Sequence, residues 1–482
     1  MLFTSLPFVG FFIVFFLLYW YVFNNNLKLQ NLLILAGSYV FYAWWDWRFL
    51  FLLAGSSLLN YFLGIGIYKS KKPKQRNILL WIGLLQGLGS LLFFKYYNFF
   101  TESITSALAA FHIKADMITL NLVLPLGISF YTFRTISYLL DIKNGKIEAT
   151  TNWVVFFSYV AFFPCLISGP IDRPKTLIPQ LQKSRVFDYN RATDGMRQIL
   201  WGLFKKVVIA DNCAMFTAGI FDHYKTQPAS ALLFGAFLFT IQVYADFSGY
   251  SDMAIGLANL LGIKVTRNFN YPFLAQNIAD FWRRWHISLT SWLTDYVFTP
   301  LSFYFRDYGK LGLILAILIN FTAIGIWHGA NWTFVLFGFL NGCFYIPLIL
   351  SGTLNRRKKA IDNTTGKLRV FLNRLALFIL VMLTFIIFRA DNLSMAFDYF
   401  GRLFSSSLFS GFVIVEKVAL IATLASIIIM LVVEWQQQDK EHALQINGIK
   451  KSPVRTLIYF SLVFLILFFS ATKNADFIYF KF

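Results

Sequence analysis

Charged residues are scarce in this 482-residue chain, at 14%, against the roughly 25% that is usual in soluble proteins. Hydrophobic residues make up 57% of the chain, and 57 residues are Phe. This composition excludes a water-soluble globular protein and indicates a polytopic membrane protein. The net charge of +20 therefore does not predict nucleic-acid binding, because its meaning depends on where the basic residues lie.

Cysteine is also scarce, since Cys165, Cys213 and Cys343 are far apart and form no C-x-x-C pair. Neither a disulfide framework nor a thiolate metal site is expected. The chain has no P-loop, no G-x-S-x-G and no G-x-G-x-x-G motif, which excludes nucleotide hydrolysis by the P-loop mechanism. The stretch DFSGYSD at 246–252 matches a calcium loop only loosely. A polar turn after an apolar segment is favoured there over a metal site.

Long apolar runs predict an all-α protein with about 11–12 membrane spans. The first run, 2–23, has no basic residue before it and no cleavage signature, so we expect a retained span. The other predicted spans are 31–45, 48–68, 78–99, 117–140, 196–220, 230–250, 311–328, 331–352, 371–389, 418–434 and 455–471. The stretches 153–169 and 273–300 contain proline and charge, which favours interfacial or re-entrant segments. With no linker or repeat, one domain is predicted over 1–482.

Basic residues concentrate on one side of this topology. Five segments carry 23 basic and 7 acidic residues: 69–77, 141–152, 171–191, 353–374 and 436–455. The opposite segments carry 6 basic and 7 acidic residues: 100–116, 221–229, 390–417 and 472–482. The positive-inside rule makes the first set cytoplasmic and puts both termini outside. Most of the excess positive charge is then explained by topology and attraction to anionic lipid.

One of the five histidines, His328, ends the apolar run ILINFTAIGIWH. An ionisable group at membrane depth usually lines a functional cavity. Imidazole can take a proton from an attacking hydroxyl, which acyl transfer between two bound substrates requires. We therefore predict His328 as a catalytic base, with Gly329 and Ala330 leaving space beside it and Asn331 orienting it. The alternative is a histidine that only joins two helices.

A second histidine, His286, lies in FWRRWH at 281–286, within the stretch richest in charge and tryptophan. Read as a helix, this segment places Trp282 and His286 on one face, and Asp280 and Arg284 on another. It either borders a site or is an amphipathic helix at the membrane interface. Zinc is disfavoured because two histidines without cysteine fall short of a three-ligand site. A phosphate-bearing acyl donor could meet the basic residues Lys264, Arg267, Arg283 and Arg284.

Six motifs follow one another within 125–342: PLGISFYTFRTISYLLD (125–141), YVAFFPCLISGPIDRP (159–174), GLFKKVVIAD (202–211), QVYADFSGYSDMAIGLANLLG (242–262), NFNYPF…FWRRWHISLTSWLTDYVFTPL (268–301) and WHGANWTFVLFGFLNG (327–342). Together with FRADNLSMA (388–396), they resemble the membrane-bound O-acyltransferase family. The likeness is strongest to its bacterial branch for O-acetylation of alginate and other exported polysaccharides. Cys165, where Gln is common, and Thr294, where Arg is frequent, depart from the pattern and bear on acceptor and donor contacts.

The resemblance implies that His328 in WHGANW is the catalytic histidine and that His286 in FWRRWH is a second functional histidine. It implies a funnel-like fold of tilted and re-entrant helices around a thinned centre. The residues expected to contact the donor or its tunnel are Asn331, Trp327, Trp285, Arg283, Arg284, Asp280, Lys264 and Arg267. No metal or permanently bound cofactor is implied, and acetyl-CoA or another acyl thioester is the expected donor.

The resulting hypothesis is an O-acyltransferase of the bacterial cytoplasmic (inner) membrane. It would pass an acyl group, expected to be acetyl, from a cytoplasmic thioester toward an exported polysaccharide, through a periplasmic or extracellular SGNH-type acetyltransferase. D-alanyl transfer to teichoic acid remains an alternative. So does a proton-coupled transporter or flippase of a lipid-linked sugar, although no inverted repeat supports it. A scaffold for a polysaccharide synthase would leave both histidines unexplained. The lipid bilayer is an expected partner and nucleic acid is not.

Overall fold

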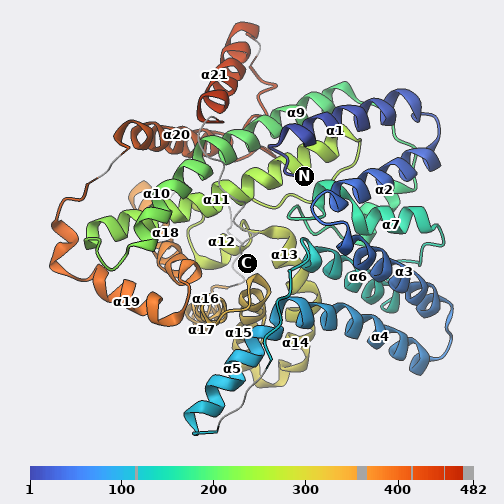
Figure 1. The fold of residues 1–482 in the computed structure, drawn as a ribbon, viewed down its shortest axis with the longest axis horizontal. Coiled ribbons are helices and arrows are strands. Elements are labelled where there is room, and N and C mark those ends of the chain that lie inside the picture. Colours follow the sequence, from blue (N-terminus) through green and yellow to red (C-terminus); the bar gives the residue numbers. More distant parts are fainter. Residues whose placement is uncertain (114–117, 355–365, 414–415, 450, 471–482) are drawn as a thin grey trace. The chain divides into compact units, whose positions relative to one another are not determined.

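The computed structural model describes residues 1–113, 118–354, 366–413, 416–449 and 451–470 (Figure 1). Every regular element in these ranges is helical, as the composition predicts. The chain packs as two compact units, Met1–Ile199 with Met253–Thr266, and Leu200–Asp252 with Arg267–Phe482. The helices α9 (Tyr189–Leu203) and α11 (Ala229–Leu260) each contribute residues to both units. The single domain expected over 1–482 stays a prediction.

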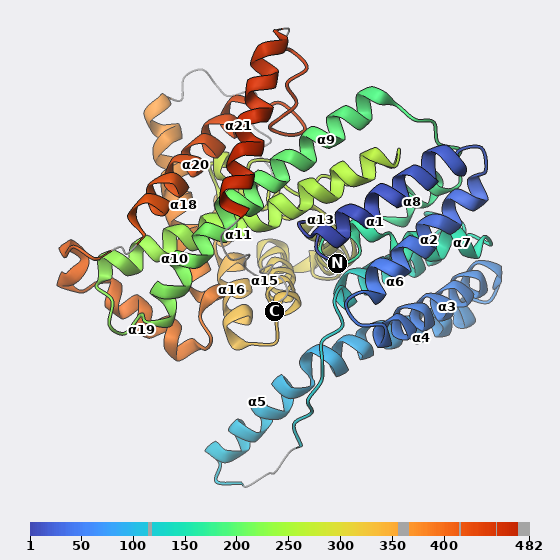
Figure 2. The same ribbon diagram turned by 45° about the horizontal axis from the view of Figure 1, so that its top comes forward.

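The first unit is a set of helices joined mostly by short turns. Its helices are α1 (Leu6–Leu17), α2 (Leu27–Ala43), α3 (Arg48–Lys69), α4 (Pro73–Leu91), α5 (Tyr97–Ala110), α6 (Ile128–Lys143), α7 (Trp153–Ala161) and α8 (Pro174–Leu181). The helices α3 and α4 lie side by side and both pack on α6 (Figure 2). A π-helical turn joins α4 to α5, and no residue of α5 is buried within the unit.

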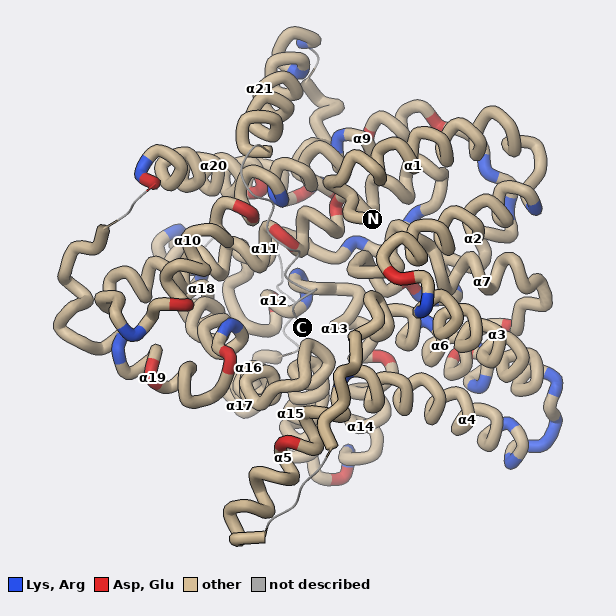
Figure 3. Tube along the Cα trace, in the orientation of Figure 1, with Lys and Arg blue, Asp and Glu red and all other residues tan. Residues whose placement is uncertain are grey.

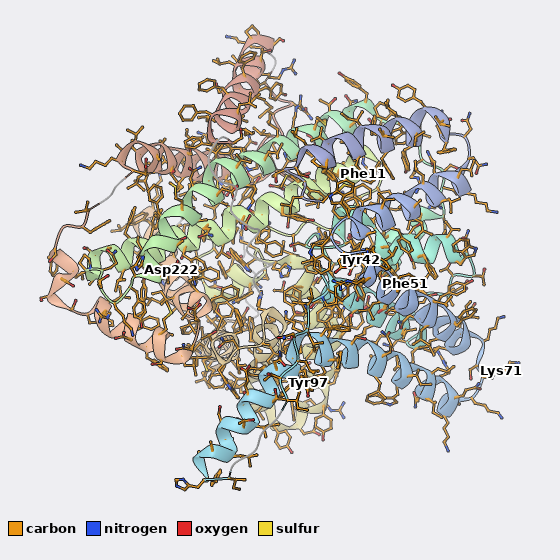
Figure 4. All side chains as sticks on the ribbon, viewed as in Figure 1. Phe11, Tyr42, Phe51, Lys71, Tyr97 and Asp222 are labelled. Carbon is orange, nitrogen blue, oxygen red and sulfur yellow. The ribbon has the colours of Figure 1, made fainter. Side chains whose placement is uncertain are left out.

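The turn between α3 and α4 is strongly basic. Figure 3 shows Lys and Arg gathered there, and the residues are Lys69, Lys71, Lys72 and Lys74. The side chain of Lys71 points away from both helices (Figure 4). A basic turn between two apolar helices is typical of the cytoplasmic side of a membrane protein.

A buried arginine organises the middle of the first unit. Arg134 of α6 is fully buried, and its guanidinium donates to the backbone oxygens of Tyr159, Val160, Cys165 and Pro170 at 3.0–3.4 Å. Arginine suits this position because its planar group presents several donors in fixed directions. Arg134 thus satisfies carbonyl groups at the end of α7 and in the segment that follows it.

The second unit carries the remaining helices. These are α10 (Asp211–Asp222), α12 (Ile278–Trp282), α13 (Ile287–Leu293), α14 (Thr299–Tyr304), α15 (Gly309–His328), α16 (Trp332–Cys343), α17 (Ile346–Leu350), α18 (Lys367–Arg389), α19 (Leu393–Leu403), α20 (Lys417–Gln436) and α21 (Ser452–Ser470). The predicted irregular stretch 273–300 consists of short helical segments rather than one crossing. The stretch 153–169 is likewise α7 followed by a 3-10 turn.

The helices α15 and α16 pack closely through two glycines. A Cβ atom at Gly338 would collide with Phe321 O and lie 2.9 Å from Gly325 Cα. Small residues let two membrane helices approach at backbone distance. This contact fixes the C-terminal half of α15, which ends at His328.

We expect Gly338→Ala to destabilise the protein by about 1–3 kcal/mol, because the added methyl group forces the two helices apart. The thermal unfolding midpoint in detergent, followed by tryptophan fluorescence, measures the effect. Gly55→Ala in α3 is the control, since its Cβ would meet no atom within 4 Å. Equal midpoints for the two variants would contradict a tight α15–α16 contact.

Eight helices among the described residues are long and apolar enough to cross a membrane, and each coincides with a predicted span. They are Arg48–Lys69, Pro73–Ala110, Ala229–Leu260, Arg306–His328, Trp332–Leu350, Lys367–Arg389, Lys417–Gln436 and Ser452–Ser470. By length and composition the described part of the chain thus offers eight spans rather than about 11–12. The protein is a multi-pass membrane protein, as predicted.

The other four predicted spans are short or interrupted. The run 2–23 is a short helix with a π-helical end, and 31–45 overlaps the 17-residue α2 and extends two residues past its end. In 117–140, residues 118–127 are not helical, and α6 begins after Gly127, whose φ of 72° is left-handed. In 196–220, α9 gives way to a π-helix (Phe204–Ala210) before α10. Hydropathy does not register such breaks in a helix.

The polar turn predicted at DFSGYSD is wrong. Residues 246–252 lie within α11, which continues to Leu260. The side chains of Asp246 and Asp252 contact Lys206 and Lys205 of the π-helix, at 2.9 and 2.6 Å. The acidic residues are thus compensated by lysines inside the unit, which a pattern read along one segment does not reveal.

Candidate active site

The second unit brings His286 and His328 to the same tryptophan. His286 lies between α12 and α13, and its ring centroid is 5.5 Å from that of Trp327. His328 ends α15, and its ring centroid is 5.1 Å from the same tryptophan. Two residues 42 positions apart in the sequence therefore share one side-chain environment.

Aromatic side chains enclose both imidazoles. His286 is fully buried and packs edge-on against Phe247 of α11, with centroids 4.6 Å apart. His328 is 5% exposed and contacts Phe388 of α18 at 5.2 Å and Phe337 of α16 at 6.1 Å. The rings are held by four different helices, and bulk water is largely excluded from them.

The backbone at His286 is left-handed, with φ 44° and ψ 51°. α12 ends at Trp282, so the segment is not the continuous helix that we predicted. The placement of Trp282 and His286 on one helical face is therefore wrong. The reason lies in a competing hydrogen bond, because Ile287 N donates to Asn268 O at 2.8 Å instead of continuing a helix.

Asn268 positions this bend. It is fully buried, and its Oδ1 accepts from the backbone N of Ser288 at 3.3 Å and from the Ser288 hydroxyl at 2.9 Å. Its Nδ2 donates to Ser251 Oγ of α11 at 3.0 Å. The start of α13 is thereby tied to α11, the helix that also carries Phe247.

Two substitutions at position 286 can test its left-handed backbone and its imidazole separately. Asparagine tolerates this conformation, whereas valine, which is branched at Cβ, does not. We expect His286→Asn to unfold near the wild-type temperature and His286→Val to be less stable than His286→Asn by about 1–3 kcal/mol. Both should lose activity, because neither side chain replaces the imidazole. If the asparagine variant were the less stable of the two, the backbone would not be the constraint.

The residues predicted around His286 take several positions. Arg284 Nε contacts Asp280 Oδ1 at 3.1 Å, so the two residues that the sequence puts on one face form an ion pair. Arg284 also donates to Asn270 O. Trp285 is buried and packs against Phe281 and Phe269, with centroids 5.3 and 5.1 Å apart. Each of these side chains supports the bend that carries His286.

Three other predicted residues make contacts of their own or belong to the first unit. Asn331 caps α16 by accepting from Thr333 N, and its Nδ2 donates to Asp391 O at 2.7 Å. Its amide is thus engaged in holding α16, and the predicted orientation of His328 by Asn331 is not observed. Lys264 belongs to the first unit. Arg267 donates to the backbone oxygens of Phe269 and Lys440.

The second unit contains a cavity of about 370 Å³ between the α13 segment and α15. Arg283 is exposed and lines it, together with Thr294 and Asp295. Deeper residues are Trp282, whose indole donates to Asn341 Oδ1 of α16 at 3.2 Å, and Asn320 of α15. The lining reaches Ile287, next to His286, and Ile324, one turn before His328. Neither histidine is among the lining residues.

The chemistry of the site follows from neutral imidazole. Burial lowers the pKa of His286 well below its ordinary value, and charge on His328 lowers it further. His286 is therefore neutral at physiological pH and able to accept a proton or a hydrogen bond. The described residues contain no group of three His, Cys, Asp or Glu that could hold a metal ion. Proton transfer between buried imidazoles and a bound substrate is the reaction type that this arrangement offers.

Sequence reasoning missed Asn268, Asn320 and Phe247 as parts of the site. Asn268 stands only in the NFNYPF motif, with no spacing that links it to position 288. Asn320 is a polar residue within the apolar run that ends at His328, and that isolation was the available signal. Phe247 carries no signal among 57 phenylalanines.

Residues 146–357 match the sequence profile of MBOAT, the membrane-bound O-acyltransferase family. The chain is 39% identical over 411 residues to the probable alginate O-acetylase AlgI of Azotobacter vinelandii, covering 84% of this chain and 78% of that protein. It is 34% identical over 423 residues to the peptidoglycan O-acetyltransferase of Helicobacter pylori, covering 82% and 77%. A teichoic acid D-alanyltransferase of Streptococcus thermophilus is 30% identical over 264 residues, covering 52% and 62%. The two acetyl-transfer proteins thus match over more of their length.

Proposed function

The chain belongs to the membrane-bound O-acyltransferase family and is an O-acyltransferase, and from that premise we propose that it transfers acetyl groups destined for an extracytoplasmic polysaccharide. The relatives named as O-acetylating enzymes support the acetyl group and the polysaccharide. Their identity and coverage exceed those of the D-alanyltransferase. The observation that carries the proposal is the convergence of His286 and His328 on the ring of Trp327.

The reaction needs little beyond positioning and proton transfer. A hydroxyl oxygen attacks the thioester carbonyl carbon, and the imidazole of His328 takes the hydroxyl proton as the new C–O bond forms. The C–S bond then breaks, and the proton passes from His328 to the leaving thiolate. In this proposal the neutral imidazole of His286 hydrogen-bonds the developing oxyanion or the acceptor. Atoms and charge balance without a metal ion or a redox step.

The donor in this proposal is a cytoplasmic acyl thioester, and the immediate acceptor is a secreted acetyltransferase of the SGNH type or the polysaccharide machinery. The cavity that reaches Ile287 and Ile324 has Arg283 among its exposed lining residues, which suits a donor with phosphate. The protein would lie in the bacterial cytoplasmic membrane with both termini outside. The basic turn between α3 and α4 would face the cytoplasm.

Inverted membrane vesicles that enclose the cell's own surface polysaccharide and its secreted acetyltransferase, and that receive [¹⁴C]acetyl-CoA from outside, test the proposal. We expect labelled acetyl ester in the polysaccharide only when the protein and the acetyl donor are both present. In a parallel assay, labelled D-alanine on a carrier protein replaces acetyl-CoA. Transfer of that label, with none from acetyl-CoA, would instead indicate aminoacyl transfer. Uptake of a lipid-linked sugar driven by a pH gradient, with no acyl donor added, would favour the transporter hypothesis.

A further inference from the structure

Asn320 is a buried polar residue in the wall of the cavity. It is 6% exposed, and it lies on α15 among apolar neighbours. Among the described residues, no donor reaches its Oδ1 with hydrogen-bond geometry. A buried amide oxygen without a partner is unfavourable, and a ligand that supplies a donor removes that cost. The position of Asn320 beside an open volume makes such a ligand possible.

Other polar groups in the wall are already used by the protein. The hydroxyl of Thr290 donates to His286 O and Ile287 O, that of Ser291 to Ser288 O, and that of Thr294 to Thr290 O. These hydroxyls satisfy carbonyl groups of the α13 segment. Asn320 differs from them because it is a buried wall residue whose side-chain oxygen accepts no hydrogen bond from the described residues.

The position of Asn320 on α15 relates it to the histidine. Residues 320, 324 and 328 repeat at intervals of four, so Asn320, Ile324 and His328 follow one face of the helix. Eight residues of helix correspond to roughly 12 Å. A ligand whose reactive carbonyl lies at His328 would therefore reach Asn320 only through an extended arm.

We infer that Asn320 is the specificity-determining residue for the donor arm, and that it hydrogen-bonds an amide of a pantetheine chain attached to the acyl thioester. The inference rests on the proposed acyl transfer and adds the chemical class that the cavity selects. A pantetheine arm is extended and carries amide N–H and C=O groups between its sulfur and its phosphate. The side-chain amide of Asn320 pairs with such a group, while Arg283 meets the phosphate at the exposed part of the cavity.

Two acetyl thioesters distinguish this role from a structural one. S-acetylpantetheine carries the amide-containing arm, whereas S-phenyl thioacetate has the same acetyl group and no amide. For Asn320→Leu we expect KM for S-acetylpantetheine to rise about 10-fold, which corresponds to roughly 1.4 kcal/mol. The kcat value should change little, and both constants for S-phenyl thioacetate should remain unchanged. Asn320→Asp, which keeps an oxygen acceptor at the same position, should retain the preference for the amide-containing donor.

Equal losses with both thioesters would overturn the inference, because they would indicate a role in packing alone. Pantetheine binding in the absence of an acceptor tests the inference independently of transfer. It is measured as the change in fluorescence of the cavity tryptophan Trp282, and the signal of a Trp282→Phe variant is subtracted. Wild-type protein that binds no pantetheine would also overturn it. Wild-type protein that binds pantetheine through Asn320 but transfers no acetyl group would contradict the proposed function instead.

The pantetheine arm has two cellular sources, coenzyme A and acyl carrier proteins. Acetyl-CoA and an acetylated carrier protein, offered separately at equal concentration, distinguish them. Asn320→Leu should weaken the use of whichever source the wild-type protein accepts. Combining Arg283→Gln with Asn320→Leu should weaken the use of that donor further, because Arg283 contacts its phosphate in this proposal.

Discussion

Acetyl transfer by His328→Ala is expected to fall by at least about 100-fold, with the protein still folded and inserted. General acid–base catalysis by a positioned side chain contributes about 10²–10⁴-fold. His328 ends α15, contacts Trp327 and lies one turn beyond the cavity residue Ile324. Without its imidazole, the base proposed for the attacking hydroxyl is lost. The measurement is the rate of transfer from acetyl thioester in reconstituted vesicles.

Two further variants separate lost chemistry from lost packing at this position. The ring of His328 fills space against Phe388 and Phe337, so its removal leaves a cavity that could lower stability. His328→Gln keeps most of the volume but cannot shuttle a proton, and we expect the same loss of transfer with a nearly unchanged unfolding midpoint. His223→Ala, at an exposed histidine after α10, should retain wild-type transfer. Full activity in His328→Gln would show that the imidazole is not the base.

Much of the fold could be predicted because a membrane helix is encoded by a run of apolar residues about as long as the bilayer is thick. The helices α3, α15, α18 and α20 follow such runs closely. The predicted spans were wrong where tertiary contacts interrupt an apolar stretch of sequence. The stretch 196–220 reads as apolar, yet Lys205 and Lys206 lie in its π-helix and are buried against the acidic residues of α11.

The candidate site was predictable to the extent that rare residues mark it. His286 and His328 stood out as ionisable groups in apolar or aromatic surroundings, and the structure places both against Trp327. The bend at His286 was not predictable, because its left-handed backbone depends on hydrogen bonds to Asn268, eighteen residues earlier. Asn331 makes other contacts than the predicted one to His328, and the reason is local. An Asn preceding a helix caps it more readily than it orients a neighbouring side chain.

A buried ion cluster holds α11 next to the site. Lys206 Nζ lies 2.8 Å from Asp211 Oδ1 and 2.9 Å from Asp246 Oδ1, and all three side chains are buried. Lys205 pairs in the same way with Asp252 of α11, at 2.6 Å. Asp246 directly precedes Phe247, the residue that packs edge-on against His286. The cluster thus links the π-helix to the helix that supports the second histidine.

Lys206→Met is expected to lower the free energy of unfolding by about 3–5 kcal/mol, since it leaves two buried carboxylates without their shared cation. Transfer should fall in parallel, because α11 no longer holds Phe247 in place. The free energy is measured by unfolding in mixed micelles of increasing sodium dodecyl sulfate. Lys206→Met combined with Asp211→Asn and Asp246→Asn removes the buried charges together and should recover much of the stability.

A solvent-exposed ion pair on the same unit provides the control for Lys206→Met. Asp222, labelled in Figure 4, lies on the same unit. It pairs with Arg389 at 3.2 Å, but its side chain is 61% exposed. Water and salt screen such a pair, so Asp222→Asn should cost less than about 1 kcal/mol. If Lys206→Met cost no more than Asp222→Asn, the cluster would not hold α11. The link from the π-helix to His286 would then have to run through the apolar contacts of Phe247 alone.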